Sequence, residues 1–513
     1  MARTRTSSIP ELLLAPLDRD GPIALHRQLE RALQDAIRRG RLAPGSALPS
    51  TRALAEELGL SRGVVVEAYE QLAAEGYLES RRGGKTRVAP RAPAGADGPW
   101  PWTAAATRRR GAADSGAGAG GPRGIGPATA AVEAPGEDVI LPFHAFTRLR
   151  YDFSYGRPDV TAFPRQAWLR SLRRVLNEAP ADELSYLDGR GARDLREALA
   201  AYLNRVRATE AAASRVVVTN GFAQAQRLVL FALRSMGRKR IAMEDPGQAD
   251  TRRAADLAGM EVVPVPVDDE GIRVDRLAEA DVAMCVVTPA HAFPTGAVMS
   301  PERRAALVRW AEERDALVLE DDYDAEYRYD REPIGAIQGL APESVVYAGS
   351  ASKTLAPGLR LAWLILPARL VEPVATIKFN SDRGTPSLEQ LTFADFLSRG
   401  EFDRHLRKMR PVYRKRRDAL LGALARHLPE LVPTGASAGL HVLAWLPPGT
   451  TPEREAAIVA RAAELQVAID GVSPMRSAPG PAGLVLGYAR LAEREIEEGV
   501  ARLAEAVRSN EPA

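Results

Sequence analysis

The loop GSASKTLAPGLR, residues 349–360, comes directly after the apolar run SVVYA. It contains Ser350, Ser352 and Lys353, and Arg360 stands seven residues beyond the lysine. Small residues and hydroxyls allow a loop to surround a phosphate, and an arginine can bind that phosphate through two hydrogen bonds. A lysine held beside them can form a Schiff base with an aldehyde. The loop therefore predicts a site for a phosphate-bearing aldehyde.

Short β-branched runs on both sides of this loop alternate with helical patterns. The runs are VVVTN, RIAMED, VVPVPV, VAMCVVTP, ALVLEDD, SVVYAGS and LAWLIL. Segments such as AQAQRLVLFALRSMG and PERRAALVRWAEERD separate them. That alternation favours an α/β domain in which a largely parallel sheet carries helices on its faces. Ligands of such sheets bind at the carboxyl ends of the strands, which is where the loop at 349–360 falls.

Two further strand ends carry polar residues suited to the same ligand. The run LVLEDDYDAEY ends a strand with three successive carboxylates and then Tyr323. A carboxylate there could pair with a protonated pyridine nitrogen, and a tyrosine hydroxyl could contact a phenolate oxygen. The run TNGFAQA, residues 219–225, joins a strand to a helix start, where backbone N–H groups can bind an anion. Each element is ambiguous by itself, but several at predicted strand ends indicate one binding site.

The N-terminal part, residues 22–88, has the pattern of three helices followed by a hairpin. Apolar residues recur every four positions from Leu25 to Ile37, which predicts an amphipathic first helix. The expected boundary residues are Arg39-Gly40 for the first helix, Ser50 and Gly59 for the second, and Ser61 and Gly76 for the third. The basic, glycine-bearing hairpin RRGGK follows. A DNA-binding wing needs such cationic side chains and a backbone that approaches phosphates closely.

The string G-x-L-x-P-G-x-x-LPSTR-x-LA-x-x-LG-x-SR, followed by AYEQLAAEGYL, resembles the GntR-type winged helix-turn-helix over nearly all of residues 22–88. The resemblance implies a double-stranded DNA operator as a partner. The DNA-facing residues that it implies by position are Arg52, Ser61, Arg62 and Gly63, with Gly83, Gly84 and Lys85 in the wing. Gly63 stands where a hydroxyl residue is common, and GGKTRV replaces the more usual wing G-x-G-T. These departures concern individual base contacts rather than the fold.

Residues 91–130 differ from the rest of the chain in composition. They contain 12 Ala, 9 Gly and 5 Pro among 40 residues. Such a stretch buries too little apolar surface to offset its ordering entropy, so it predicts a flexible linker with a reach of ~40 Å, enough to contact a neighbouring subunit. Positive charge gathers at this end: residues 1–90 hold 14 basic and 11 acidic side chains, whereas the residues after 130 hold 50 and 53. A polyanion partner is expected there.

About residues 150–507 look like a fold-type I aminotransferase, a family that binds pyridoxal 5′-phosphate (PLP). The matching motifs are YGRPD, YLDGRGARDLREALAAYL, EDPG, VTPAHAFPTG, LEDDYDAEYRY, ASKTLAPGLR, DRGTPSLEQ and FDRHLRKMRPVYRKRRDAL. The N-terminal part (the head) and about residues 150–507 (the body) together resemble the MocR/GabR group of GntR-type transcription regulators. The resemblance implies an α+β winged helix DNA-binding domain at 15–90, an Ala/Gly/Pro-rich linker at 91–145 and an α/β aminotransferase-like effector domain at 146–510.

The resemblance also implies a role for each matching residue. Lys353 would form the internal aldimine with PLP, Asp321 would pair with the pyridine nitrogen, and Tyr323 would contact the 3′ oxygen. The residues implied to hold the phosphate are Ser350, Ser352, Arg360 and the Gly221-Phe222-Ala223 backbone. Tyr186 would reach the phosphate of the partner subunit, so a homodimer is implied, with a head-to-tail swapped arrangement. His291 either lies near the ring or has a structural role, and no metal is expected.

Three positions differ from ordinary aminotransferases. Phe293 replaces the asparagine before Pro-Thr-Gly, and Gln248 stands where an aromatic residue usually follows EDPG. In the run LVLGYAR, Val485 occupies the position of the arginine that binds a substrate carboxylate, although Arg476 or Arg383 could substitute. An amino-acid substrate would lose a charge-assisted pair. We therefore expect a regulator that senses PLP itself, in vitamin B6 homeostasis, and place second a regulator that senses an amino acid or amine.

Two alternatives remain. The chain could be an active aminotransferase with a vestigial head, which Val485 disfavours. The Arg/Lys-rich helix at 404–417 could form additional DNA-contact surface rather than a solvated helix face. Among the 513 residues no run approaches ~18 apolar positions, so no membrane span is expected. The single cysteine, Cys285, lies in the apolar run VAMCVV and predicts a buried thiol. A cytoplasmic protein, on the nucleoid when bound to DNA, is expected.

Overall fold

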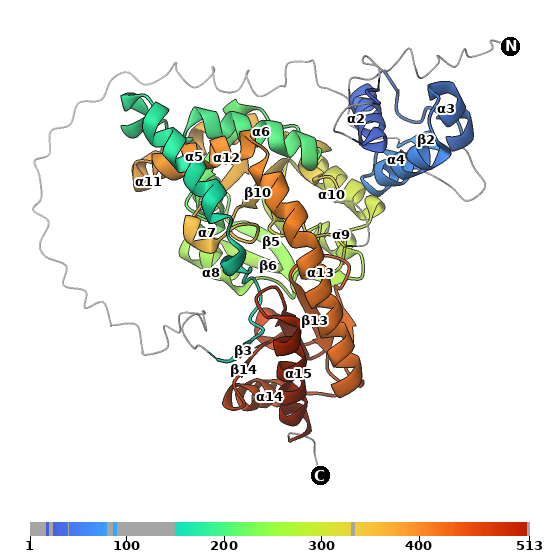
Figure 1. Cartoon of the computed structure of the whole chain (residues 1–513), viewed down its shortest axis with the longest axis vertical. Helices are drawn as coiled ribbons and strands as arrows, with labels where there is room; N and C mark the ends of the chain where they lie inside the picture. Colours follow the sequence, from blue (N-terminus) through green and yellow to red (C-terminus); the bar gives the residue numbers. More distant parts are fainter. Residues whose placement is uncertain are drawn as a thin grey trace, which may run out of the picture.

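The computed structural model describes residues 17–19, 24–38, 41–79, 86–89, 149–329 and 334–509. Within them the chain forms a small N-terminal head and a large body (Figure 1). The predicted wing residues Gly83, Gly84 and Lys85 and the predicted linker at 91–145 lie outside the described residues.

The described part of the head contains three helices and a two-stranded antiparallel sheet. Their bounds are α2 Leu25–Arg38, α3 Thr51–Leu58, α4 Arg62–Ala74, β1 Leu78–Glu79 and β2 Arg87–Val88. Ser50 caps α3 by accepting a hydrogen bond from Ala53 N at 3.2 Å, and Ser61 caps α4 by accepting from Val64 N at 3.4 Å. Both predicted caps are confirmed. The leucines of α2 pack with those of α3 and α4 in one small core.

The body is built on an eight-stranded sheet with the strand order β4-β11-β10-β9-β8-β5-β6-β7. The bounds are β4 Val216–Thr219, β5 Arg240–Asp245, β6 Glu261–Asp268, β7 Gly271–Ile272, β8 Met284–Val287, β9 Leu317–Asp322, β10 Val345–Ser350 and β11 Ala362–Ile365. The neighbours from β10 through β6 run parallel, which confirms the prediction. The predicted strand LAWLIL forms β11 but runs antiparallel to both of its neighbours.

Helices cover both faces of this sheet. Their bounds are α5 Arg165–Glu178, α6 Arg193–Val206, α7 Phe222–Ser235, α8 Ala249–Leu257, α9 Val274–Leu277, α10 Pro301–Arg314, α11 Ala368–Asp382 and α12 Ser387–Ser398. Val216 and Val218 of β4 pack into one core cluster, and Val217 between them packs into another. Because alternate residues of a strand point to opposite faces, both faces of the sheet are buried. The predicted burial of Cys285 in β8 is confirmed.

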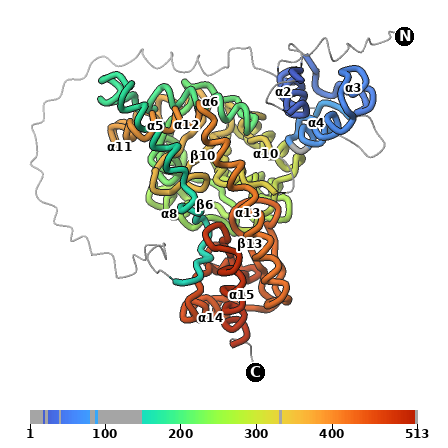
Figure 2. Tube along the Cα trace, in the orientation of Figure 1, coloured from blue at the N-terminus to red at the C-terminus, as the bar shows by residue number. Residues whose placement is uncertain are grey.

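A second, smaller unit forms the C-terminal end of the body. It holds the four-stranded sheet β12-β13-β16-β15. Its elements are α13 Glu401–His427, β12 Val432–Thr434, β13 His441–Trp445, α14 Pro452–Glu464, β15 Asp470–Gly471, β16 Gly483–Gly487 and α15 Glu493–Arg508, and β14 Val467–Ala468 pairs with β3 Tyr151–Asp152. Helix α13 runs from the large body into this unit (Figure 2) and packs against α15. None of the described helices is long and apolar enough to cross a membrane.

Candidate functional site

The predicted site residues of the body gather at the carboxyl ends of β4, β9 and β10. Lys353 follows β10, and its Nζ donates a hydrogen bond to the Gly156 carbonyl at 2.6 Å. Gly156 has a φ of +71°, and a Cβ there would lie 2.7 Å from that Nζ. The YGRPD glycine is therefore needed for the lysine to occupy its place. Burial lowers the pKa of Lys353, and the nearby carboxyl groups oppose that shift.

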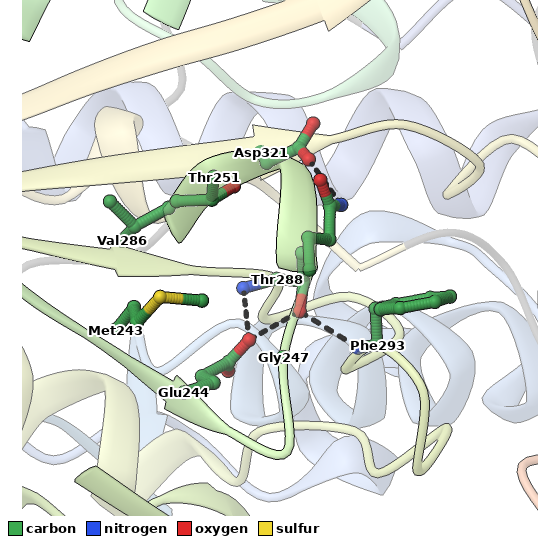
Figure 3. A pocket seen from close by; sticks show the side chains of 9 residues that line it. Met243, Glu244, Gly247, Thr251, Val286, Thr288, Phe293 and Asp321 are labelled. Atoms are coloured by element: carbon green, nitrogen blue, oxygen red, sulfur yellow. Dashed lines mark hydrogen bonds between the residues drawn. The ribbon is translucent and has the colours of Figure 1, made fainter. Parts of the chain in front are cut away.

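Asp321 lies on β9 beside the lysine and is buried. Burial raises the pKa of its carboxyl to about 8. Gln248 donates from Nε2 to Asp321 Oδ2 at 3.0 Å. Figure 3 shows Asp321 among the side chains that line a pocket together with Thr288 and Phe293. A protonated pyridine nitrogen would give this buried carboxylate the positive partner that favours its ionised form. Gln248, noted in the sequence only as a departure, is therefore a functional neighbour of Asp321.

Tyr323 and His291 belong to one buried polar cluster. The Tyr323 hydroxyl donates to the His291 carbonyl at 3.0 Å. His291 Nδ1 lies 3.2 Å from Asp324 Oδ2, and its Nε2 lies 3.1 Å from the Gly435 carbonyl. His441 packs against the His291 ring with the centroids 4.7 Å apart. Both His291 ring nitrogens thus face oxygen acceptors, which favours the structural role for this histidine over a metal ligand.

An anion cradle lies at the start of α7. Gly221 is the residue before α7 and has a φ of +91°. Arg360 donates from Nη2 to the Asn220 carbonyl at 2.7 Å, and a Cβ on Gly221 would collide with that nitrogen. Only glycine leaves room for this guanidinium beside the helix start. The backbone N–H groups of Phe222 and Ala223 begin the helix there and are suited to hold a phosphate.

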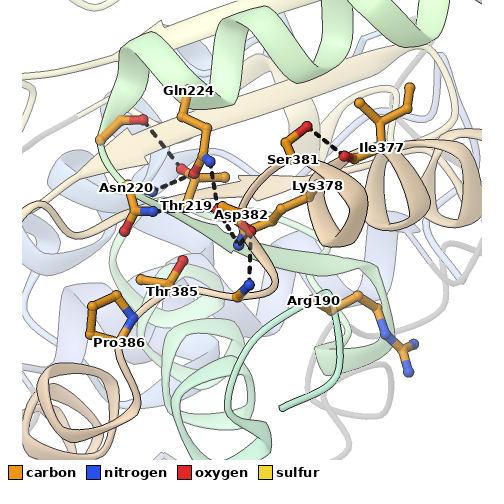
Figure 4. Close-up of polar contacts among 12 residues, drawn as sticks. Arg190, Thr219, Asn220, Gln224, Ile377, Lys378, Ser381, Asp382, Thr385 and Pro386 are labelled. Carbon is orange, nitrogen blue, oxygen red and sulfur yellow. Dashed lines mark hydrogen bonds and ion pairs between the residues drawn. The ribbon is translucent and has the colours of Figure 1, made fainter. Parts of the chain in front are cut away.

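A second polar network fastens the first turn of α7 (Figure 4). Asp382, at the end of α11, accepts hydrogen bonds from Gln224 Nε2 at 2.6 Å and from the buried Lys378 Nζ at 2.9 Å. Asn220 Nδ2 lies 3.4 Å from the same carboxylate. Sequence reasoning missed these supporting residues. The motif DRGTPSLEQ begins at Asp382, so the sequence contained a signal for this residue although it did not indicate its role.

The remaining predicted phosphate ligands differ in exposure. Ser350 ends β10, Ser352 lies in the following turn, and both are half-buried. Tyr186 is 81% exposed and is not brought to the other site residues of its own chain. A primary amine, a buried carboxylate, hydroxyls, a guanidinium and a helix start thus converge, and two glycines keep the space open. This donor set fits PLP, whose aldehyde and electron-withdrawing ring would supply chemistry on primary amines.

The predicted DNA-facing residues of the described head are all exposed. Arg52 on α3 is exposed, and Ser61, Arg62 and Gly63 are exposed at the start of α4. A Cβ on Gly63 would meet only Ser61 Oγ, at 3.8 Å, so its backbone stands in open space. A helix start with free approach and two arginines is suited to a phosphate backbone.

Comparison with known families assigns both parts of the chain. Residues 152–503 match the family "Aminotransferase class I and II", and residues 25–88 match "Bacterial regulatory proteins, gntR family". The chain is 33% identical over 492 residues to "Probable rhizopine catabolism regulatory protein MocR" of Rhizobium meliloti, covering 94% of each chain. It belongs to the MocR-type, PLP-dependent regulators of the GntR family.

Two further relatives connect this regulator to the cofactor. It is 30% identical to the "HTH-type pyridoxine biosynthesis transcriptional regulator PdxR" of Corynebacterium glutamicum, over 82% of this chain and 83% of that one. The crystal structure of LysN, an α-aminoadipate aminotransferase of Thermus thermophilus complexed with N-(5′-phosphopyridoxyl)-L-leucine, is similar with a TM-score of 0.64 and 28% identity. That match covers 71% of this chain and 93% of LysN. The regulator therefore binds PLP through an aminotransferase-like body.

The position of the missing carboxylate arginine is apolar in this regulator. Val485 of β16 is buried and packs with Phe293, Leu443, Val472 and Met475. The two possible substitutes have other partners: the Arg476 guanidinium lies 5.7 Å from the Trp445 ring, and the Arg383 guanidinium lies 5.0 Å from the Phe379 ring. Within the described residues no hydrogen bond or ion pair links either guanidinium to Lys353 or Asp321.

Two arginines of the basic helix α13 contact the body. Arg414 donates from Nη2 to the Tyr329 carbonyl at 2.5 Å, and Arg416 pairs with Asp159 at 2.9 Å. Arg414 is nevertheless exposed and Arg416 is half-buried, so a DNA-contact surface and a solvated helix face both stay predictions for this helix. Their guanidiniums satisfy backbone carbonyls and a carboxylate where α13 crosses the body.

Proposed function

We propose that this regulator senses PLP and that PLP binding changes the affinity of its heads for an operator. The observation that carries the proposal is the contrast between a cradle suited to PLP and the apolar cluster around Val485. A cofactor sensor needs only the cradle. An amino-acid sensor also needs a cation for the carboxylate, and Val485 cannot supply one.

The proposed roles follow the position of each side chain. Lys353 holds the aldehyde carbon, Asp321 holds the protonated pyridine nitrogen, and Tyr323 faces the 3′ oxygen. The proposed phosphate ligands are Ser350, Ser352, Arg360 and the backbone of Gly221, Phe222 and Ala223. Gln248 donates to Asp321 at 3.0 Å and keeps that carboxylate oriented toward the ring.

A second copy of the chain completes the proposed site. Tyr186 is 81% exposed, and Leu184 and Leu176 nearby are 56% and 60% exposed. Apolar residues grouped in this way are typical of a surface that another protein covers. We propose a homodimer in which Tyr186 reaches the phosphate held by the partner, with the head-to-tail swapped arrangement of the two subunits.

The proposed operator contacts come from the head. Arg52 and the residues Ser61, Arg62 and Gly63 at the start of α4 face the DNA, and Gly83, Gly84 and Lys85 form the wing. The proposed division of the chain is 15–90 for the head, 91–145 for the linker and 146–510 for the body. An operator-binding protein of this kind works in the cytoplasm, on the nucleoid when bound, and vitamin B6 homeostasis is the proposed process.

The test titrates an operator fragment, obtained by in vitro selection with the full chain, against cofactor-stripped protein with and without PLP. We expect a change in operator affinity of at least fivefold and a visible absorbance band from the bound cofactor. Lys353→Ala should remove both, whereas exposed Lys239→Ala should keep both. Equal operator affinity with and without PLP would overturn the proposal.

The same protein decides between the alternative ligands. With PLP bound, a panel of amino acids and amines is added while the absorbance band and operator affinity are followed. No further change is expected, because the Val485 cluster offers no carboxylate partner. A band shift and an affinity change with one compound would make the regulator an amino-acid or amine sensor, and steady turnover with a keto acid would make it an aminotransferase.

A further inference from the structure

The C-terminal end of α4, called the recognition helix below because its first residues are proposed to face DNA, contacts the body through one buried carboxylate. Glu75 is the C-cap of α4, whose opposite end carries the DNA-facing residues. Its side chain is 4% exposed although it lies between two domains. Gln71 Nε2 donates to Glu75 Oε1 at 2.8 Å, Gln34 Nε2 donates to Oε2, and the backbone N–H of Gly335 in the body donates to Oε1 at 3.2 Å.

Two buried arginines hold the body loop that meets Glu75. Arg207 donates to the Ile334 carbonyl, and Arg304 donates from Nη1 to the Gly335 carbonyl at 2.8 Å. Each arginine is 1% exposed. A Cβ on Gly335 would lie 3.1 Å from Glu75 Cδ, so the head and this loop are in close contact. A shift of the loop must therefore move Glu75 or break its hydrogen bond.

Arg207 also contacts a residue next to the cofactor site. Arg207 Nε pairs with Asp322 Oδ2 at 2.7 Å, and Tyr347 of β10 donates to that oxygen at 2.7 Å. Asp322 directly follows Asp321 on β9. The two carboxyl groups interact electrostatically: the charge of Asp322 contributes to the raised pKa of Asp321, after burial. A cationic ring nitrogen on Asp321 changes the charge balance next to Asp322 and Arg207.

The head also touches the body on the other side of Arg207. Arg38 of α2 donates to the Ala208 carbonyl and, from Nε, to the Tyr77 hydroxyl at 3.0 Å. A polar cavity of about 390 Å³ opens between the two surfaces and is lined in part by Glu75 and Arg207 themselves. Leu340 of the body also packs against the core of the head. The interface is therefore small and largely polar. Such an interface can rearrange at small cost, unlike a large apolar one.

We infer that the contacts from Asp322 through Arg207 and Gly335 to Glu75 transmit PLP occupancy to the recognition helix. The inference rests on the proposed PLP sensing and adds a route through direct contact between a head and a body. In the head-to-tail swapped homodimer proposed above, the head would make these contacts with the body of the partner subunit. Buried ion pairs occupy discrete arrangements, because a half-broken pair leaves an uncompensated charge. PLP can bias the head only if the two arrangements bind it differently, and charge at Asp321 provides that difference.

The test measures operator affinity with and without PLP in Glu75→Ala and Gly335→Ala. The first removes the carboxylate from the head, and the second crowds it from the body without changing the head. Gly335 has no left-handed φ, so its backbone accepts alanine, whose Cβ would lie 3.1 Å from Glu75 Cδ and 3.2 Å from Ala208 Cβ. Both variants should keep PLP affinity within twofold, while the ratio of operator affinities falls from at least fivefold to below twofold. Glu70→Ala, exposed on the same helix, should keep the wild-type ratio.

The outcomes separate this inference from the proposed function. If the wild-type protein shows no PLP-dependent affinity, the proposed function itself fails. If the wild type responds and both variants respond equally, the contact route is wrong and the signal travels elsewhere. The melting curve of each variant is compared with that of the wild type to show whether the variant folds. If Glu75→Ala unfolds the head, Gly335→Ala still tests the route.

Discussion

The head and the body of this regulator place their functional residues in opposite surroundings. Arg62 and Gly63 stand exposed at a helix start, whereas Asp321 and Asp322 lie buried at the end of a strand. Exposed groups keep their ordinary charges and act through salt-dependent contacts. Burial disfavours the charged form of a group, so a buried charge needs a partner inside the fold. Substitutions should therefore affect binding alone in the head, and stability together with ionisation in the body.

The strongest effect is predicted at the buried ion pair of Arg207 and Asp322. Arg207→Ala leaves the Asp322 carboxylate without its cation at an almost fully buried position. We expect the free energy of unfolding to fall by about 3–5 kcal/mol, measured by urea titration. Arg193→Ala, which breaks the exposed pair with Glu197, is the matched control and should leave stability unchanged. An equal loss in both variants would contradict the comparison.

A second effect concerns pH in the cofactor-free protein. Burial raises the pKa of Asp321 to about 8, above its value in the unfolded chain, so the folded state binds the extra proton between about pH 4 and 8. The contribution of Asp321 to the free energy of unfolding is therefore complete below that range. As pH rises through the range, the free energy of unfolding falls by about 1.4 kcal/mol per pH unit. Asp321→Asn should flatten the profile, most visibly between pH 7 and 8, in urea titrations at each pH.

Other buried carboxyl groups also make the folded state less stable as pH rises. Glu244 and Glu320 also have pKa values raised to about 7 by burial. They remain in Asp321→Asn, so a residual slope below pH 7 is expected. A variant profile that matches the wild type up to pH 8 would show that Asp321 is ionised in the folded protein.

The exposed side predicts a smaller effect that is confined to binding. Arg62→Ala should weaken operator affinity by roughly tenfold and reduce the slope of log affinity against log salt by about 1, because one phosphate contact is lost. Its melting temperature should not change, since the side chain is exposed. Arg461→Ala on α14 is the control for lost charge. An unchanged salt slope would remove Arg62 from the DNA surface.

The weakest effect is predicted at Gly63. Gly63→Ser restores the hydroxyl residue that is common at this position, and its Cβ would meet only Ser61 Oγ at 3.8 Å. Stability should stay within about 0.5 kcal/mol, as for surface positions in general. Operator affinity should change by no more than a few-fold in a gel-shift titration. A large loss would mean that DNA approaches this backbone more closely than a side chain allows.

Much of the fold could be predicted because its determinants are local. The caps Ser50 and Ser61, the helix from Leu25 and the strands of the parallel sheet follow from neighbouring residues. The direction of β11 and the C-terminal sheet could not, because short apolar runs do not encode their partners. The contacts of the α13 arginines could not be predicted for a related reason: their acceptors, such as the Tyr329 carbonyl, lie far along the chain.

Local motifs identify the residues that gather at the strand ends: Lys353, Asp321 and the glycines that make room for them. How those residues are supported and charged depends on contacts that form only in the folded chain. Asp382 meets Gln224 across 158 positions, Arg207 meets Asp322 across 115, and Glu75 meets Gly335 across 260. Burial, which shifts the pKa of Asp321, is likewise a property of the assembled core. Local spacing fixes elements and motifs, whereas long-range packing sets ionisation and joins the head to the body.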